Sequence, residues 1–116
     1  MEIEVSEVGE GERKVTCIRL NGRLDAPGAD RIDTQFTEAA VAMGRDVVVD
    51  LSGVSFVASM GIRLLIASAR GLRGKGAQMV LFGAPPLVHT VLDQAALDQI
   101  IPMVATEQHA LDRLAA

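Results

Sequence analysis

Two histidines, and two aspartates that end apolar segments, are the first candidates in this 116-residue chain for acid–base or metal chemistry. Such chemistry needs several groups at set spacings, because catalysis and metal binding each use a constellation of side chains. His89 and His109 stand apart from each other and from any cysteine or carboxylate pair. Asp25 and Asp50 are first interpreted as a helix cap and a strand-end polar group, with a binding role for Asp25 as second choice. The sequence predicts a protein that is not an enzyme, with no metal site and no cofactor.

The glycines and the single cysteine add no reactive site. Gly71, Gly74 and Gly76 follow a predicted helix, whereas a phosphate-binding loop needs its glycines ahead of a helix N-terminus. Cys17 lies in an apolar run with no base beside it, so we expect a buried, unreactive thiol. One cysteine also excludes an internal disulfide.

Ser59 is the side chain whose position suggests regulation. It lies between a strand-like run at 46–51 and a helix expected from about residue 60. A serine at such a junction can cap the helix by accepting hydrogen bonds from its free N–H groups. A phosphoserine, with about −1.5 to −2 charges, is also favoured there by those amides and the helix dipole. The residues alone favour the cap, and a phosphorylation switch is the alternative.

The composition is that of one globular domain spanning residues 1–116. Hydrophobic residues make up 49% and charged residues 22%, which is enough apolar side chain for a buried core. With three Phe and no Trp or Tyr, that core must be aliphatic, and the scarcity of aromatic rings argues against a base-stacking nucleic-acid platform. The net charge of −4 also argues against direct nucleic-acid binding. Arg63, Arg70 and Arg73 are interpreted as a solvated helix face.

The chain carries no sign of a targeting or membrane-spanning segment. Its N-terminus is acidic and lacks the basic and apolar regions of a signal peptide. No apolar run approaches the roughly 20 residues that cross a bilayer. We therefore expect a cytoplasmic protein with no membrane insertion.

Two short strands are predicted at the start of the chain. Residues 2–8 alternate apolar with acidic side chains, and residues 13–20 are again strand-like. Gly9, Glu10 and Gly11 form a turn signal between them, so the pair reads as an antiparallel hairpin. Asn21 and Gly22 are predicted to break the second strand.

A helix is predicted after this hairpin. Asp25 or Ala26 can cap it, and Pro27 suits its first turn. Gly44 is expected to end it. Its buried face is predicted from apolar residues at three- and four-residue spacing, which are Ile32, Phe36, Ala39, Ala40 and Met43.

Strands and helices alternate through the rest of the chain. Strands are predicted at 46–51, 77–82 and 99–104, and helices at about 60–73, from 83–86 onward and after Thr106. Pro102 implies an edge position for the last strand. This order predicts an α/β fold: a mixed central β-sheet with parallel neighbours and one antiparallel edge, covered by about four helices.

Two segments resemble the signature regions of STAS domains, the anti-sigma factor antagonist family. Val47 to Ile66 reads VVVDLSGVSFVASMGIRLLI, where the family has an apolar strand, Asp-Leu-Ser-x-Val-x-Phe, and then Asp-Ser-Ser/Thr-Gly-Leu opening a helix. The segment 21–26 resembles the Gly-x-Leu-Asp loop of the family. Element order and length also fit, so the resemblance covers essentially the whole chain and implies a STAS fold. The residues in step with the first motif are Asp50, Leu51, Ser52, Val54, Phe56, Ser59, Gly61 and Ile62.

The resemblance implies a regulator that acts by binding proteins. In the family, the serine in the place of Ser59 is phosphorylated by a partner that is both anti-sigma factor and serine kinase, with a histidine-kinase-like ATPase fold. The unphosphorylated antagonist binds this partner and releases the sigma factor. Phosphorylation breaks the complex, and a serine phosphatase restores it. We therefore expect Ser59 to be the phosphoacceptor, beside partner-binding residues Leu24, Asp25, Ala58, Met60, Gly61 and Arg63.

Two positions depart from the family pattern. Ala58 replaces an acid that would be a hydrogen-bonding and electrostatic neighbour of the serine, and Met60 replaces the second Ser/Thr with an apolar side chain. The alternative function is an accessory or scaffold subunit of a signalling assembly or transport system, which binds without being phosphorylated. A nucleotide-binding module is a third possibility, ranked last because no phosphate loop is present.

Overall fold

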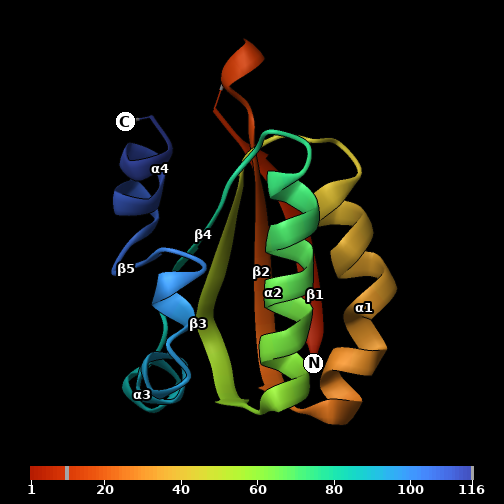
Figure 1. Cartoon of the computed structure of the whole chain (residues 1–116), viewed down its shortest axis with the longest axis vertical. Coiled ribbons are helices and arrows are strands. Elements are labelled where there is room, and N and C mark those ends of the chain that lie inside the picture. The colour runs from red at the N-terminus through yellow and green to blue at the C-terminus, as the bar shows by residue number, and fades with distance from the viewer. Residues whose placement is uncertain (10, 116) are drawn as a thin grey trace.

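The structure is a computed structural model that describes residues 1–9 and 11–115 (Figure 1). Within these residues, five strands form one sheet in the order β1-β2-β3-β4-β5. The strands are β1 (Glu2–Val8), β2 (Val15–Leu24), β3 (Val47–Val57), β4 (Met79–Phe82) and β5 (Met103–Val104). β1 pairs antiparallel with β2, and every later neighbour is parallel. The predicted mixed sheet with one antiparallel edge is confirmed.

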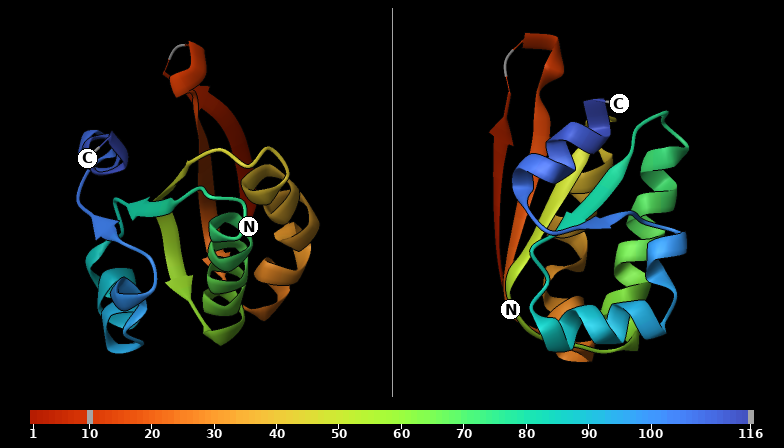
Figure 2. Two further views of the ribbon diagram at one scale, coloured as in Figure 1. Left: turned by 45° about the horizontal axis from the view of Figure 1, so that its top comes forward. Right: turned by 90° about the vertical axis from the view of Figure 1, so that its left-hand side faces the viewer.

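The described residues also form four α-helices and two short 3₁₀ turns. The helices are α1 (Ala26–Val41), α2 (Ser59–Arg73), α3 (Pro86–Gln94) and α4 (Glu107–Ala115), and the turns are η1 (Gly11–Arg13) and η2 (Leu97–Gln99). α1 and α2 pack side by side on one face of the sheet, as Figure 1 shows. α4 packs against β3 and β4 on the other face (Figure 2). None of these helices is long and apolar enough to cross a membrane.

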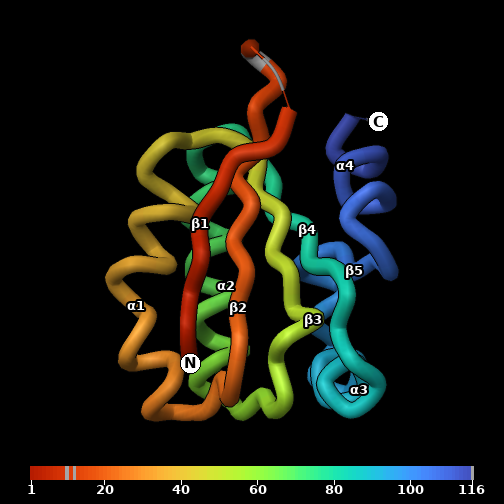
Figure 3. The backbone as a smooth tube through the Cα atoms, turned by 180° about the vertical axis from the view of Figure 1, so that it is seen from behind, coloured from red at the N-terminus to blue at the C-terminus, as the bar shows by residue number. Residues whose placement is uncertain are grey.

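The core is aliphatic, as the composition predicts. The larger apolar cluster fills the space between the sheet and α1 and α2, with Phe36 fully buried at its centre. A smaller cluster beneath α4 joins Cys17, Val48 and Phe82 to Ala110. Cys17 is buried there, and this burial raises the pKa of its thiol, so the prediction of a buried thiol is confirmed. Seen from behind, the described helices leave this face of β1 and β2 uncovered (Figure 3).

Two strands run further than the sequence predicts. β2 continues through Asn21 and Gly22 to Leu24, so the predicted break at these residues is wrong. The register between β2 and β3 shifts here instead, and Gly22 takes a φ of +112°. Because glycine adopts such a backbone without steric cost, the strand absorbs an irregularity and stays in the sheet. The longer β3 places Asp50 inside a strand and not at its end.

Smaller differences concern the ends of elements. α1 ends at Val41, and Met43 lies beyond it with 64% of its surface exposed, so its predicted place on the buried helix face is wrong. Gly44 follows with a φ of +63°, which turns the chain after the helix as predicted. Glu10, in the predicted hairpin turn, lies outside the described residues. The second strand begins at Val15, after η1.

Candidate functional site

The two segments singled out by the sequence lie together at one edge of the sheet. Leu24 at the end of β2 pairs with Val57 at the end of β3, and the Ala58 N–H donates to the Leu24 carbonyl oxygen at 3.0 Å. α1 and α2 therefore begin side by side where the parallel strands end (Figure 1). The carboxyl edge of parallel strands is where α/β folds carry binding groups.

Gly61 allows α2 to begin this close to β2. A Cβ atom on Gly61 would lie 2.5 Å from Leu24 Cγ and 2.6 Å from the Leu24 carbonyl oxygen. Leu24 itself is fully buried, and Gly61 is buried against it. The expectation that these two residues contact a partner directly is corrected, because neither reaches the surface. They support the exposed residues from below.

Asp25 caps α1, as the sequence predicts. Its Oδ1 accepts the Gly28 N–H at 2.9 Å, and its Oδ2 accepts the Arg23 Nε–H at 3.3 Å. The Gly28 amide, and then the Arg23 guanidinium, hold the pKa of the Asp25 carboxyl below its ordinary value. Asp25 is thus an ionised group in a fixed orientation at the start of α1.

The lowered pKa of Asp25 gives a pH-dependent contribution to stability. Because the pKa is lower in the folded than in the unfolded chain, this contribution is present above the unfolded value of about 3.9 and is lost as the pH falls through the folded value. We expect Asp25→Ala to lower the urea midpoint at pH 7, and this loss to shrink below about pH 4. Asp30→Ala removes the same charge from an exposed aspartate of the same helix, so it controls for the loss of charge alone. A loss of equal size at pH 7 and pH 2.5 would contradict this assignment.

Ser59 does not cap α2, so the interpretation that the residues alone favoured is wrong. Ala58 holds the cap position with an extended backbone, and its carbonyl oxygen accepts the Ile62 N–H at 3.1 Å. Ser59 is the first helical residue and is exposed. Among the described residues, no side-chain hydrogen bond involves its hydroxyl group. The serine hydroxyl therefore has no part in holding this helix.

The N-terminus of α2 differs from that of α1 in its cap. The Asp25 side chain accepts an amide of α1, whereas the Ala58 side chain has no acceptor for the amides of α2. The amides of Ser59, Met60 and Gly61 precede the first helical hydrogen bond, made by Ile62. These amides and the positive end of the helix dipole lie next to the Ser59 hydroxyl.

Replacing Ala58 with aspartate should supply the missing cap. We expect Ala58→Asp to stabilise the fold by about 1 kcal/mol, since a capping acceptor is worth that much at a helix start. Ala67→Asp adds the same charge at an exposed position within α2, where it caps nothing and lowers helix propensity. Urea unfolding followed by circular dichroism compares the two. If the two variants were equally stable, the amides at the start of α2 would already have hydrogen-bond partners.

Apolar and cationic side chains surround this helix start. Phe56 and Met60 are 41% and 45% exposed. The Arg23 guanidinium lies over the Phe56 ring, 4.3 Å from its centroid, while it also pairs with Asp25. Arg63 is exposed one turn further along α2, beside a hollow of about 290 Å³ between α1 and α2. We give the name Ser59 surface to the half-buried Asp25 and the exposed residues Arg23, Phe56, Ser59, Met60 and Arg63.

Sequence reasoning missed the role of Arg23. It named Phe56 only as a position matching the motif, and Arg23 only within the loop that contains Asp25. The contact between them depends on the register, which sets Arg23 opposite Phe56 across β2 and β3. The sequence did offer one signal for the role of Arg23, which is its place two residues before the capping aspartate.

The other candidate residues lie elsewhere. Asp50 is 6% exposed inside β3, where its carboxylate pairs with Arg19 at 3.1 Å and accepts the Ser52 N–H at 2.9 Å. It stands seven residues before the end of β3, so the fold does not bring it to Asp25. His89 and His109 are exposed on α3 and α4. The described residues hold no group of three or more side chains suited to a metal ion.

Comparisons with known proteins agree with this fold. The STAS domain model matches residues 8–110. An anti-sigma F factor antagonist of Paenibacillus polymyxa is 30% identical over 106 residues, which cover 90% of this chain and 91% of that protein. A STAS-domain anti-sigma-factor antagonist from Planctomyces limnophilus superimposes with a TM-score of 0.83 at 27% identity, covering 98% of each chain. The Bacillus cell fate determinant SpoIIAA in its phosphorylated form has a TM-score of 0.68 at 25% identity, covering 97% of this chain and 98% of that one. With this family match over most of its length, the chain belongs to the STAS domain family.

Proposed function

We propose that this chain is an anti-sigma factor antagonist that binds an anti-sigma factor with serine kinase activity and is switched by phosphorylation of Ser59. The observation that carries this proposal is the Ser59 hydroxyl itself, which is exposed at the start of α2 and makes no structural hydrogen bond among the described residues. Relatives named as antagonists of anti-sigma factors support the class of partner. Action through binding, in the cytoplasm where sigma factors work, is part of the proposal.

A phosphate on Ser59 fits the local electrostatics. The uncapped amides at the start of α2 favour an anion there, so the domain can accept the group without unfolding. The Ser59 surface carries two cations, Arg23 and Arg63, and one anion, Asp25, for a net charge of +1. A phosphate of about −2 reverses the sign of this surface.

The same surface explains why phosphorylation would break a complex. Phe56 and Met60 are large exposed apolar side chains, which suit the buried centre of a protein interface. A phosphoserine beside them would have to lose its water when the partner docks, and an unpaired buried charge is costly. Unphosphorylated Ser59 carries no such penalty. The switch would therefore act on the stability of the complex and leave the fold intact.

Dissociation of the complex on addition of ATP tests this function. A tagged chain and its purified anti-sigma factor are bound together, then MgATP is added. We expect the wild-type complex to dissociate as phosphate accumulates, and the Ser59→Ala complex to persist because the acceptor is gone. A serine phosphatase should restore binding of the released protein. Persistence of both complexes in MgATP would contradict the switch.

A second candidate function is an accessory or scaffold subunit that binds its partner permanently. The exposed Met60 side chain next to Ala58 favours it, because an apolar contact without a neighbouring acid suits constant binding. This candidate predicts a complex that is insensitive to ATP and unchanged by Ser59→Ala. The release experiment thus separates the two functions.

A further inference from the structure

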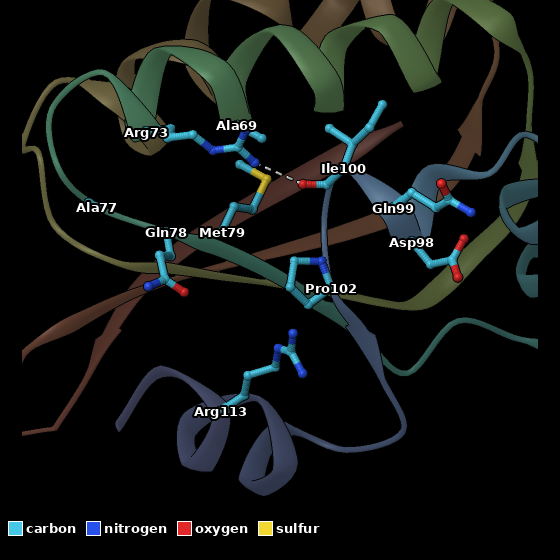
Figure 4. Close-up of a pocket in the computed structure, with 10 residues that line it drawn as sticks. All are labelled: Ala69, Arg73, Ala77, Gln78, Met79, Asp98, Gln99, Ile100, Pro102 and Arg113. Carbon is cyan, nitrogen blue, oxygen red and sulfur yellow. Dashed lines mark hydrogen bonds between the residues drawn. The ribbon is translucent and has the colours of Figure 1, made fainter. Parts of the chain in front are cut away.

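A cavity of about 380 Å³ lies at the far end of α2 from Ser59 (Figure 4). Its walls come from the last turns of α2, the start of β4, the segment 98–102 and α4. Arg73 at this cavity stands 14 residues after Ser59 along α2, which is about 21 Å at 1.5 Å per residue. The proposed protein-binding switch makes no use of this cavity.

Two arginines reach this cavity from elements forty residues apart. Arg73 stands in the last turn of α2, and its Nη2 donates to the Ile100 carbonyl oxygen at 3.0 Å. A guanidinium has five N–H donors, so this bond uses only one of them. Arg113 extends from α4, and Figure 4 shows its guanidinium directed toward Pro102 at the cavity. Within the described residues, no carboxylate lies within ion-pairing distance of Arg113.

The remaining polar groups suit an anion as well. The Gln78 side chain lines the cavity on the same side as Arg73 and adds amide N–H donors. Asp98 is the single carboxylate in the lining. Figure 4 shows the Asp98 side chain on the other side of the segment 100–102 from Gln78. The lining thus offers two cations and the Gln78 amide against one carboxylate, in a chain with a net charge of −4.

Helix position alone does not account for this arrangement. Both arginines occupy the last turns of their helices, where the dipole favours a cation. That preference explains an arginine on each helix but not that both arginines line one hollow. Two guanidinium groups that line one hollow add their positive potentials there, which favours an anion.

We propose that this cavity binds a small multivalent anion, a metabolite whose phosphate or carboxylate oxygens are clustered. Guanidinium groups bind such oxygens in pairs of parallel hydrogen bonds, which a lone lysine cannot do. The volume falls at the lower end of the range of about 300–1,000 Å³ typical of small-molecule sites. Two cations are too few for a nucleic-acid backbone, whose binding needs a longer basic surface.

Nuclear magnetic resonance titration of the ¹⁵N-labelled chain tests this site. Pyrophosphate and citrate are added separately, with sodium chloride at matched ionic strength as the reference. We expect saturable shifts of backbone amides near Arg73, in the segment 98–102 and near Arg113. Arg113→Gln should weaken binding about tenfold, the effect of losing a charge-assisted hydrogen-bond pair. Arg31→Gln removes the same charge from an exposed position on α1, outside both the cavity and the Ser59 surface, and should leave binding unchanged.

Each outcome of the titration decides the proposal. Saturation by pyrophosphate alone identifies phosphorylated ligands, and saturation by citrate alone identifies polycarboxylates. Arg113 is exposed, so its variants keep the fold, and Arg113→Lys should bind less tightly than wild type because it loses the paired hydrogen bonds. No saturable shift at 20 mM of either anion, or equal weakening by Arg31→Gln and Arg113→Gln, overturns the site. The test needs no partner protein, so it stands apart from the proposed function.

Discussion

Gly61→Ala is expected to destabilise the fold by about 2–3 kcal/mol, although it adds one methyl group. That methyl would lie 2.5 Å from Leu24 Cγ and 2.6 Å from the Leu24 carbonyl oxygen, well inside van der Waals contact. The carbonyl oxygen cannot move aside freely, because it accepts the Ala58 N–H at 3.0 Å. Relief requires α2 to shift away from β2, which disturbs both the core and the Ser59 surface.

Gly71→Ala provides the matched control within the same helix. A Cβ on Gly71 would meet the nearest Val41 methyl at 3.4 Å, an ordinary contact. Because alanine forms helix better than glycine, this variant should be neutral or more stable by up to about 1 kcal/mol. Chemical unfolding of the wild type and both variants measures the difference. If Gly61→Ala is as stable as Gly71→Ala, close packing at the α2 start is not what positions the site.

Ser59→Glu is expected to weaken the proposed anti-sigma factor complex by about thirtyfold or more. Burying one uncompensated charge in an interface costs at least about 2 kcal/mol, which corresponds to that factor. Ser59→Ala removes only an exposed hydroxyl and should bind within about threefold of wild type. Affinities come from calorimetric titration with the purified partner.

Gln35→Glu controls for added negative charge. Gln35 is exposed in the middle of α1, outside the Ser59 surface, and its substitution should change affinity less than threefold. Thirtyfold weakening by Gln35→Glu would mean that overall charge, and not position 59, governs binding. Unchanged affinity in Ser59→Glu would remove the helix start from the interface.

Sequence patterns predicted the order of elements and the sheet type, because alternation and helical spacing depend on local residues. These patterns failed where tertiary contacts determine the end of a strand or helix. Gly22 looked like a strand break, yet the sheet retains it as an irregularity in register. Met43 kept the helical spacing of the buried face but falls beyond the end of α1. The local spacing of apolar residues does not show where strand pairing or helix packing ends.

The motifs located the site, but not the roles within it. Both signature segments meet at the sheet edge, as the resemblance implied. The motif could not tell that Leu24 is buried while Met60 is exposed, since that depends on how α2 packs on β2. The position of Ser59 before a helix, taken without the motif, had favoured a cap, because serine is a common capping residue, whereas the extended cap residue is Ala58. The anion cavity lay beyond sequence reasoning, which saw Arg73 as solvated helix surface and could not place Arg113 beside it.

Phosphate mapping on Ser59 tests the central proposal most directly. The chain is incubated with its purified anti-sigma factor kinase and MgATP, digested, and examined by mass spectrometry. Ser55→Ala, which removes another exposed serine four residues earlier, serves as the control beside Ser59→Ala. The account predicts one phosphate per chain on Ser59, retained in Ser55→Ala and lost in Ser59→Ala. Phosphate on another residue, or none after prolonged incubation with an active kinase, would contradict it.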